Sequence, residues 1–126
     1  MYVSDTHAWI YYLLNRLPEK VDSIFTTVEK HDETMFVPTI VLNECIHIIE
    51  SGKISLDYEE LFAKFDTSDN FVVVPLDLEV TRLVPKIRLS ELHDRIIVAT
   101  AKILNAVLVT KDKKIAESGL VKTVWG

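Results

Sequence analysis

Short apolar runs alternate along this chain with longer segments in which apolar residues recur every three or four positions. The short runs are continuously apolar and rich in valine and aromatic residues, which is typical of strands covered on both faces of a parallel sheet. They predict strands at residues 1–4, 35–38, 71–76, 106–110 and 122–125. The alternation of these strands with helices predicts an α/β fold with a central parallel sheet.

The longer segments have the spacing of amphipathic helices. They cover residues 7–15, 18–31, 39–51, 55–65, 77–87, 90–105 and 113–119. Thr39 and Ser90 are predicted N-caps, and Ser55 with Glu59 resembles a capping box displaced by one residue. Gly119 is predicted to end the last helix.

Length and composition indicate an ordinary globular protein. The 126 residues, 48% of them hydrophobic, predict one domain over residues 1–126. No apolar run is long enough to span a bilayer, and the N-terminus lacks the pattern of a signal peptide. Cys45 is the single cysteine, which excludes an internal disulfide and suits a reducing compartment. We therefore expect a cytoplasmic protein that does not enter the membrane.

The formal net charge of −5 argues against an unaided, high-affinity grip on nucleic acid, which usually needs a basic surface. It does not exclude an enzyme that acts on nucleic acid. Acidic side chains concentrated at a metal site would have their field reversed by the bound cations.

Glu44 lies in an almost wholly apolar stretch, VLNECIHII at residues 41–49. On a helix its neighbours three and four positions away are mostly apolar, so it lies on a face expected to pack against the sheet. An isolated buried carboxylate is costly unless it is protonated, paired or bound to a metal. The alternative is a glutamate at the rim of the helix that reaches solvent.

Three aspartates have a comparable setting. Asp94 lies on the buried stripe near the start of a helix, where the helix dipole alone would favour it. Asp5 and Asp112 follow predicted strands and precede helices, so each is also a candidate N-cap. Ligand sites of parallel sheets gather at the carboxyl ends of strands, where both lie.

Taken together, the four acids predict a metal site. Converging carboxylates repel one another and raise one another's pKa. They stay ionised together when a hard divalent cation lies between them, and oxygen-only ligation suits Mg²⁺ or Mn²⁺. Such a site, with one or two ions, activates a water and stabilises a phosphodiester transition state.

Three motifs then carry a resemblance to a known family. VSDTHAWIYYL resembles the strand–Asp–Thr start of PIN domains, and VLNECIHI resembles their helix with an inward glutamate. ELHDRIIVATAKILNAVLVTKDKKI resembles their Asp-Arg pair, alanine-rich helix, strand and Thr-x-Asp. Within the PIN domains, the chain is similar to the VapC-type toxins of prokaryotic toxin–antitoxin pairs, over nearly its whole length.

The resemblance implies a three-layer α/β/α sandwich with four to five strands and a Mg²⁺- or Mn²⁺-dependent endoribonuclease that hydrolyses RNA phosphodiester bonds. It implies a homodimer held in check by a small antitoxin that covers or enters the acidic pocket. By position, the catalytic residues and metal ligands would be Asp5, Glu44, Asp94 and Asp112. Thr6 and Thr110 would hold a ligand water or a phosphate, and Arg95, Lys111, Lys113 and Lys114 are the candidate RNA contacts.

The chain departs from the family pattern before the Asp-Arg pair. Many relatives have Asp-Pro-Phe there, whereas this chain has Glu91, Leu92 and His93. We do not count Glu91 as a ligand, and we expect the histidines to be surface or packing residues. Trp9, near the first helix, is expected at a dimer interface.

Three alternatives stay open. The chain could be a PIN-like module that binds RNA or protein without catalysis, or a stand-alone PIN nuclease that processes RNA. A phosphoacceptor domain of the receiver type would also have aspartates at strand ends, with Asp77 as the acceptor. Its usual acidic pair after the first strand is missing here, because Asp5 stands alone.

Overall fold

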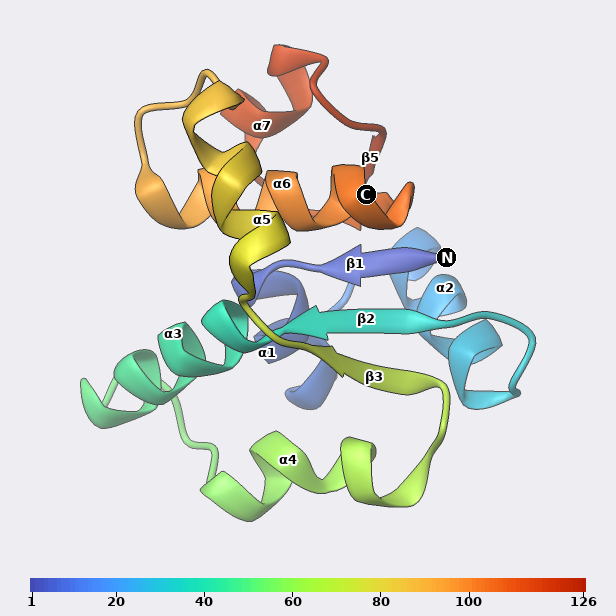
Figure 1. The fold of residues 1–126 in the computed structure, drawn as a ribbon. Helices are drawn as coiled ribbons and strands as arrows, with labels where there is room; N and C mark the ends of the chain where they lie inside the picture. The colour runs from blue at the N-terminus through green and yellow to red at the C-terminus, as the bar shows by residue number, and fades with distance from the viewer.

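A computed structural model describes all 126 residues, and it contains a five-stranded sheet and seven α-helices (Figure 1). The strands are β1 (Tyr2–Ser4), β2 (Met35–Pro38), β3 (Phe71–Val74), β4 (Val107–Val109) and β5 (Thr123–Val124). The helices are α1 (Thr6–Leu13), α2 (Glu19–Glu29), α3 (Thr39–Glu50), α4 (Tyr58–Thr67), α5 (Leu78–Leu83), α6 (Leu92–Leu104) and α7 (Lys113–Ser118), with a 3₁₀ turn, η1 (Val84–Lys86), after α5. The predicted α/β fold is confirmed, and the ends of each element lie within about three residues of their predicted places. None of the helices has the length and apolar character needed to cross a membrane.

All neighbouring strands of the sheet are parallel, in the order β3-β2-β1-β4-β5. Successive connections run outward from β1 to β2 and then to β3. The chain then crosses to β4 through α5 and α6, which are drawn above β1 in Figure 1, and continues outward to β5. The direction of winding therefore reverses between β1 and β4. In open parallel sheets this reversal leaves a crevice at the carboxyl ends of the two strands.

The predicted helix caps are partly wrong. The capping box of α4 is formed by Asp57 and Glu60, not by Ser55 and Glu59, because the helix begins one turn later than its apolar pattern suggested. Thr39 is the first residue of α3 and not its cap, and its hydroxyl accepts a hydrogen bond from the Leu76 amide. The sequence pattern located these two helices but not the residues that cap them.

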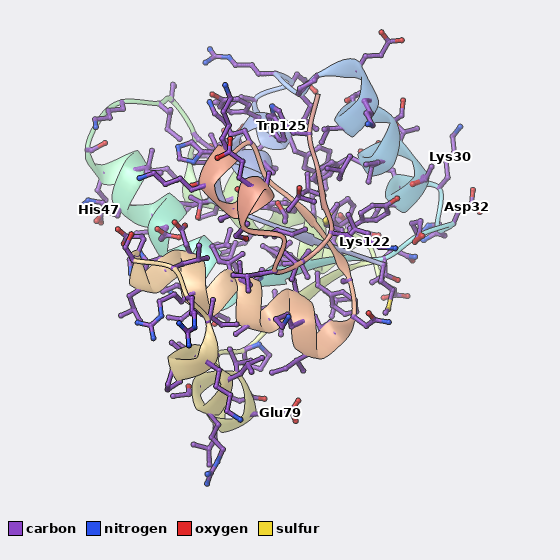
Figure 2. All side chains as sticks on the ribbon, turned by 90° about the horizontal axis from the view of Figure 1, so that it is seen from above. Lys30, Asp32, His47, Glu79, Lys122 and Trp125 are labelled. Atoms are coloured by element: carbon purple, nitrogen blue, oxygen red, sulfur yellow. The ribbon has the colours of Figure 1, made fainter.

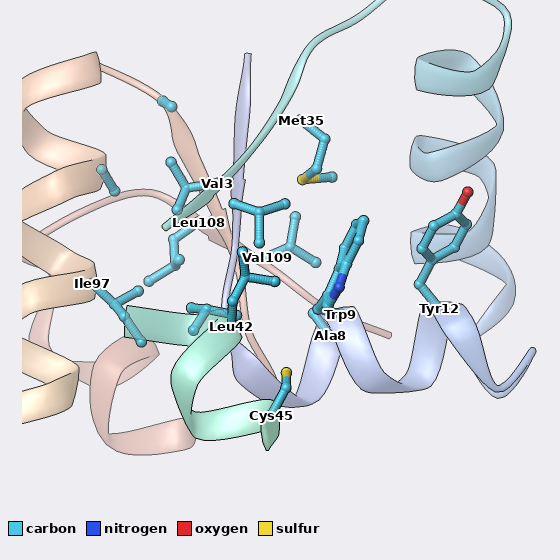
Figure 3. Close-up of a cluster of buried hydrophobic side chains, with 14 of the residues drawn as sticks. Val3, Ala8, Trp9, Tyr12, Met35, Leu42, Cys45, Ile97, Leu108 and Val109 are labelled. Atoms are coloured by element: carbon cyan, nitrogen blue, oxygen red, sulfur yellow. The ribbon is translucent and has the colours of Figure 1, made fainter. Parts of the chain in front are cut away.

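Trp9 is fully buried, so the expectation that it lies at a dimer interface is wrong. Figure 3 shows it rising from α1 into the core beside Met35, with Tyr12 one turn further along the helix. Its ring stacks on Phe65 of α4 with centroids 5.2 Å apart, and it meets Phe71 of β3 at 5.7 Å. Trp9 thus joins α1, α4 and the sheet in one aromatic cluster.

Candidate functional site

A cavity of about 250 Å³ opens where the winding of the sheet reverses, beyond the carboxyl ends of β1 and β4. The four acids that the sequence singled out all line it, although they are up to 107 positions apart in the chain. Its lining consists of Asp5, Thr6, His7, Glu44, Ile48, Asp94, Ile97, Lys111 and Asp112. Two acids come from strand ends, one from α3 and one from the first turn of α6.

Asp5 and Asp112 are both N-caps, as their positions predicted. One Asp5 oxygen accepts a hydrogen bond from the Ala8 amide at 2.9 Å, and one Asp112 oxygen accepts from the Lys114 and Ile115 amides. The buried Thr110 links them, because its hydroxyl donates to Asp5 and accepts from the Asp112 amide. Capping therefore fixes both carboxylates at the cavity, although it engages one oxygen of each.

Glu44 is held by two partners across the cavity rim. Its Oε1 accepts a hydrogen bond from the Thr6 hydroxyl at 2.7 Å, and its Oε2 lies 2.8 Å from Nδ1 of His93. The Glu44 side chain is 26% exposed. The Thr6 hydroxyl from α1 and the His93 imidazole from α6 thus stabilise the Glu44 carboxylate on the apolar face of α3. These two contacts also hold the carboxylate beside the cavity.

The crowding of carboxylates perturbs two of them. Burial, followed by repulsion from Asp112 and the other nearby acids, raises the pKa of Asp94 to about 6. Burial also raises the pKa of Asp5, although hydrogen bonds from Thr110 and Ala8 act in the opposite direction. Uncompensated negative charge is therefore unfavourable in this cavity, and a cation placed there would be attracted.

The donor set fits a hard divalent cation, but the carboxylates are not arranged as a finished coordination shell. No group of three or more histidine, cysteine, aspartate or glutamate side chains is placed so that it could hold a metal ion. The physical reason is visible in the contacts, since Glu44 is engaged by Thr6 and His93, and one oxygen of each strand-end aspartate caps a helix. Four carboxylates around one cavity nevertheless supply the oxygen ligands that Mg²⁺ and Mn²⁺ prefer.

The remaining predicted residues divide into two groups. Thr6 and Lys111 line the cavity, and Thr110 lies beneath it, hydrogen-bonded to Asp5. Arg95 does not reach the cavity, because its guanidinium donates to the Val84 carbonyl at 3.0 Å and supports the turn η1. We therefore leave Arg95 out of the substrate contacts proposed below.

Comparison with known families decides which family the chain belongs to. The sequence model of the PIN domain family matches residues 2–119, which is almost the whole chain. This chain belongs to the PIN domain family. No curated protein gives a significant match to its sequence.

Solved structures with a similar fold agree with this assignment. The chain is similar to VapBC2 from Rickettsia felis bound to a fragment of promoter DNA, with TM-score 0.73, 18% identity and 99% and 98% of the two chains covered. It is similar to FitAcB from Neisseria gonorrhoeae (TM-score 0.66, 19% identity, 98% and 96% covered) and to a toxin–antitoxin complex from Klebsiella pneumoniae (TM-score 0.66, 18% identity, 98% and 96% covered). These neighbours are toxins of toxin–antitoxin pairs. The predicted PIN-like fold is confirmed.

Sequence reasoning missed two histidines of this PIN domain site, His7, which lines the cavity, and His93. His93 is a surface residue as expected, with its side chain 43% exposed, but its ring also bonds to Glu44. The signal was available, because His93 stands where the sequence departs from the family pattern, directly before Asp94. A polar, hydrogen-bonding residue at that point was a reason to look for a partner across the cavity.

Proposed function

We propose that this PIN domain is a Mg²⁺- or Mn²⁺-dependent endoribonuclease. The observation that carries the proposal is the convergence of four carboxylates from β1, α3, α6 and β4 on one cavity, where Asp94 has a pKa raised to about 6. Capping a helix does not require an aspartate to lie near other carboxylates. A shared divalent cation would favour their convergence, and it is the usual cofactor of enzymes that cut phosphodiesters in such sites.

Asp5, Glu44, Asp94 and Asp112 would hold the cation, as one or two ions. A bound cation supplies Lewis acidity, which activates a water and stabilises negative charge on the phosphate. The water adds to phosphorus, one phosphorus–oxygen bond to the ribose breaks, and the departing oxygen takes up a proton. Thr6 and Thr110 orient Glu44 and Asp5 through the hydrogen bonds described above. Lys111, at the cavity rim, is placed to bind a phosphate oxygen of RNA.

We further propose that the enzyme is the toxin of a toxin–antitoxin pair, acting as a homodimer and restrained by a small antitoxin. The support is the similarity of fold to chains of toxin–antitoxin complexes over nearly their whole length. An acidic cavity with the lysine at its rim is accessible to a peptide that carries one or two cationic side chains. Such a peptide would neutralise the carboxylates in place of the metal.

The nuclease proposal is tested by incubating the purified protein with a mixed pool of RNA in the presence of Mg²⁺, Mn²⁺ or a chelator. We expect discrete cleavage products with either metal and none with the chelator. Restoration of cleavage when metal is added back in excess excludes irreversible damage to the protein. Cleavage that persists in the chelator would contradict the proposed cofactor and indicate a contaminating nuclease.

A binding module without catalysis is the second candidate. It is favoured by one observation, that the carboxylates form no finished metal-binding group and Glu44 is paired with His93. Calorimetric titration with Mn²⁺ separates the two candidates. A nuclease binds the ion at the acidic cavity, and an inactive module shows no heat of binding.

His93 is expected to position Glu44 for metal binding. A carboxylate oxygen has two lone pairs, so Oε2 accepts from His93 and still offers one to a cation. Outer partners of metal ligands typically contribute about 10- to 100-fold in affinity, so we expect His93→Ala to weaken Mn²⁺ binding about tenfold by calorimetry. The control is His47→Ala, because His47 is an exposed histidine of α3 with no hydrogen bond to Glu44. Tighter binding in His93→Ala would mean that the imidazole competes with the ion.

A further inference from the structure

Lys111 is fixed at the rim of the acidic cavity by an aromatic ring. Its ammonium donates a hydrogen bond to the Tyr11 hydroxyl at 2.9 Å and lies 4.9 Å from the centre of the same ring. A lysine that is held by both contacts loses less freedom when it meets an anion than a free surface lysine does. The cation is therefore presented at one place, next to the site of the proposed chemistry.

Two further rings lie next to Tyr11. Trp125 lies 6.0 Å from Tyr11 between ring centres, and His7 lies 6.4 Å from Tyr11. The pairing of β5 with β4 brings Trp125 to this place, since the amide of Thr110, directly after β4, donates to the carbonyl of Val124, the last residue of β5. We call His7, Tyr11, Lys111 and Trp125 the aromatic strip. The strip is continuous with the cavity, because two of its residues, His7 and Lys111, also line the cavity.

The two tryptophans of this chain differ in a way that matters here. Trp9 is fully buried in the core, whereas Trp125 is part-exposed near the end of the chain (Figure 2). Trp125 packs partly against the core. A part-exposed indole retains some surface on which a planar group can stack.

The charge around the strip is opposite to that of the cavity. Lys111, Lys113 and Lys114 lie within four positions, all three are exposed, and none forms a salt bridge. In a chain of net charge −5, this is a local excess of positive charge directly beside the acidic cavity. Basic groups interleaved with aromatic rings are the combination that binds single-stranded nucleic acid without base-edge recognition.

We propose that the aromatic strip binds single-stranded RNA on one side of the cleaved phosphate. Lys111 contacts a backbone phosphate, and a base of the flanking nucleotides stacks on Trp125. This inference rests on the proposed nuclease function and adds the path of the substrate to it. The proposal also explains how an acidic protein binds RNA, since the RNA contacts are confined to one strip and do not require a basic surface overall.

The first experiment follows tryptophan fluorescence while short oligouridylate or oligoadenylate is added in a chelator or in Ca²⁺. Stacking quenches an indole, and the buried Trp9 is out of reach of RNA. We expect quenching that saturates with RNA and is absent in Trp125→Phe. Saturable binding without any change of Trp125 fluorescence would overturn the proposal.

Labelled RNA then gives affinities by fluorescence anisotropy. We expect about tenfold weaker binding in Trp125→Leu and nearly unchanged binding in Trp125→Phe, because phenylalanine keeps a ring on which the base stacks. In Lys111→Gln, the slope of log affinity against log salt should fall by about 0.7, the share of one phosphate of a single strand. Equal affinities for the leucine and phenylalanine variants would contradict stacking.

The matched control is Lys64→Gln. Lys64 also lies over a tyrosine ring, that of Tyr12 at 5.5 Å, but it pairs with Glu29 and lies on α4 outside the cavity. A loss of binding in this control equal to that in Lys111→Gln would overturn the assignment. The readout involves no cleavage, so the two proposals fail separately. If RNA quenches Trp125 but is never cut by the wild-type protein, the nuclease proposal alone is refuted. If Trp125→Leu cleaves RNA and binds it with wild-type affinity, the aromatic-strip proposal alone is refuted.

Discussion

Asp94→Asn is expected to reduce metal-dependent RNA cleavage by more than about a hundredfold, because even outer partners of metal ligands contribute about 10- to 100-fold. Asp94 lies in the first turn of α6 and faces three other acids across the cavity. The amide has nearly the same shape, so the fold is preserved, but it lacks the charge that attracts the cation. The measurement is the initial rate of cleavage in Mn²⁺ at equal protein concentration.

The same substitution is expected to stabilise the protein in the absence of metal. The pKa of Asp94 is raised from 3.8 to about 6 in the folded protein, so the folded state binds more protons than the unfolded state between these values. Stability therefore falls as the pH rises through this interval, and the full penalty is present above about pH 6. Asp94 is part-exposed and solvent screens the repulsion, so we expect Asp94→Asn to gain about 1 kcal/mol at neutral pH.

Thermal unfolding in a chelator at about pH 4 and about pH 7.5 measures this gain. The difference between wild type and Asp94→Asn cancels the titration of groups elsewhere in the chain, and it should be larger at the higher pH. Asp66→Asn is the matched control, since Asp66 is an exposed aspartate of α4. Cleavage retained in Asp94→Asn would remove this residue from the site, and a loss of stability would show that its carboxylate supports the fold.

Trp9→Ala is expected to lower the free energy of unfolding by about 3–5 kcal/mol, a large part of the total stability of a domain of this size. The ring is fully buried and contacts Tyr12, Phe65 and Phe71. Its removal leaves a cavity between α1, α4 and the sheet that rigid neighbours cannot fill. Urea denaturation measures this loss of unfolding free energy. The substitution would also weaken the packing of α1, which carries Thr6 and His7.

Two further variants sharpen this prediction. Trp9→Phe should cost much less, because it keeps a ring and removes the indole Nε1, which is buried without a hydrogen-bond partner. Phe62→Ala should cost about 0.5 kcal/mol or less, since Phe62 is 38% exposed on α4. If Trp9→Ala kept its unfolding free energy but changed its mass in solution, the side chain would lie at an interface between copies.

The sequence by itself determined the fold class and the four acids. The apolar runs of β1, β2 and β4 are short and continuous because these inner strands are covered on both faces, and that pattern is local. Asp5 and Asp112 were recognisable because they follow such runs, at the end of parallel strands where ligands bind. Glu44 stood out for a similar reason, since a lone carboxylate on an apolar helix needs a partner.

Tertiary structure decided everything that depends on the order of strands and on side chains from distant segments. The reversal of winding between β1 and β4 places Asp5 beside Asp112, and no local pattern encodes that order. The partners of Glu44, the burial of Trp9 and the turning of Arg95 toward Val84 were likewise invisible. Local patterns report which side of a helix is buried, whereas the identity of what covers it depends on packing between segments that meet only when the chain folds.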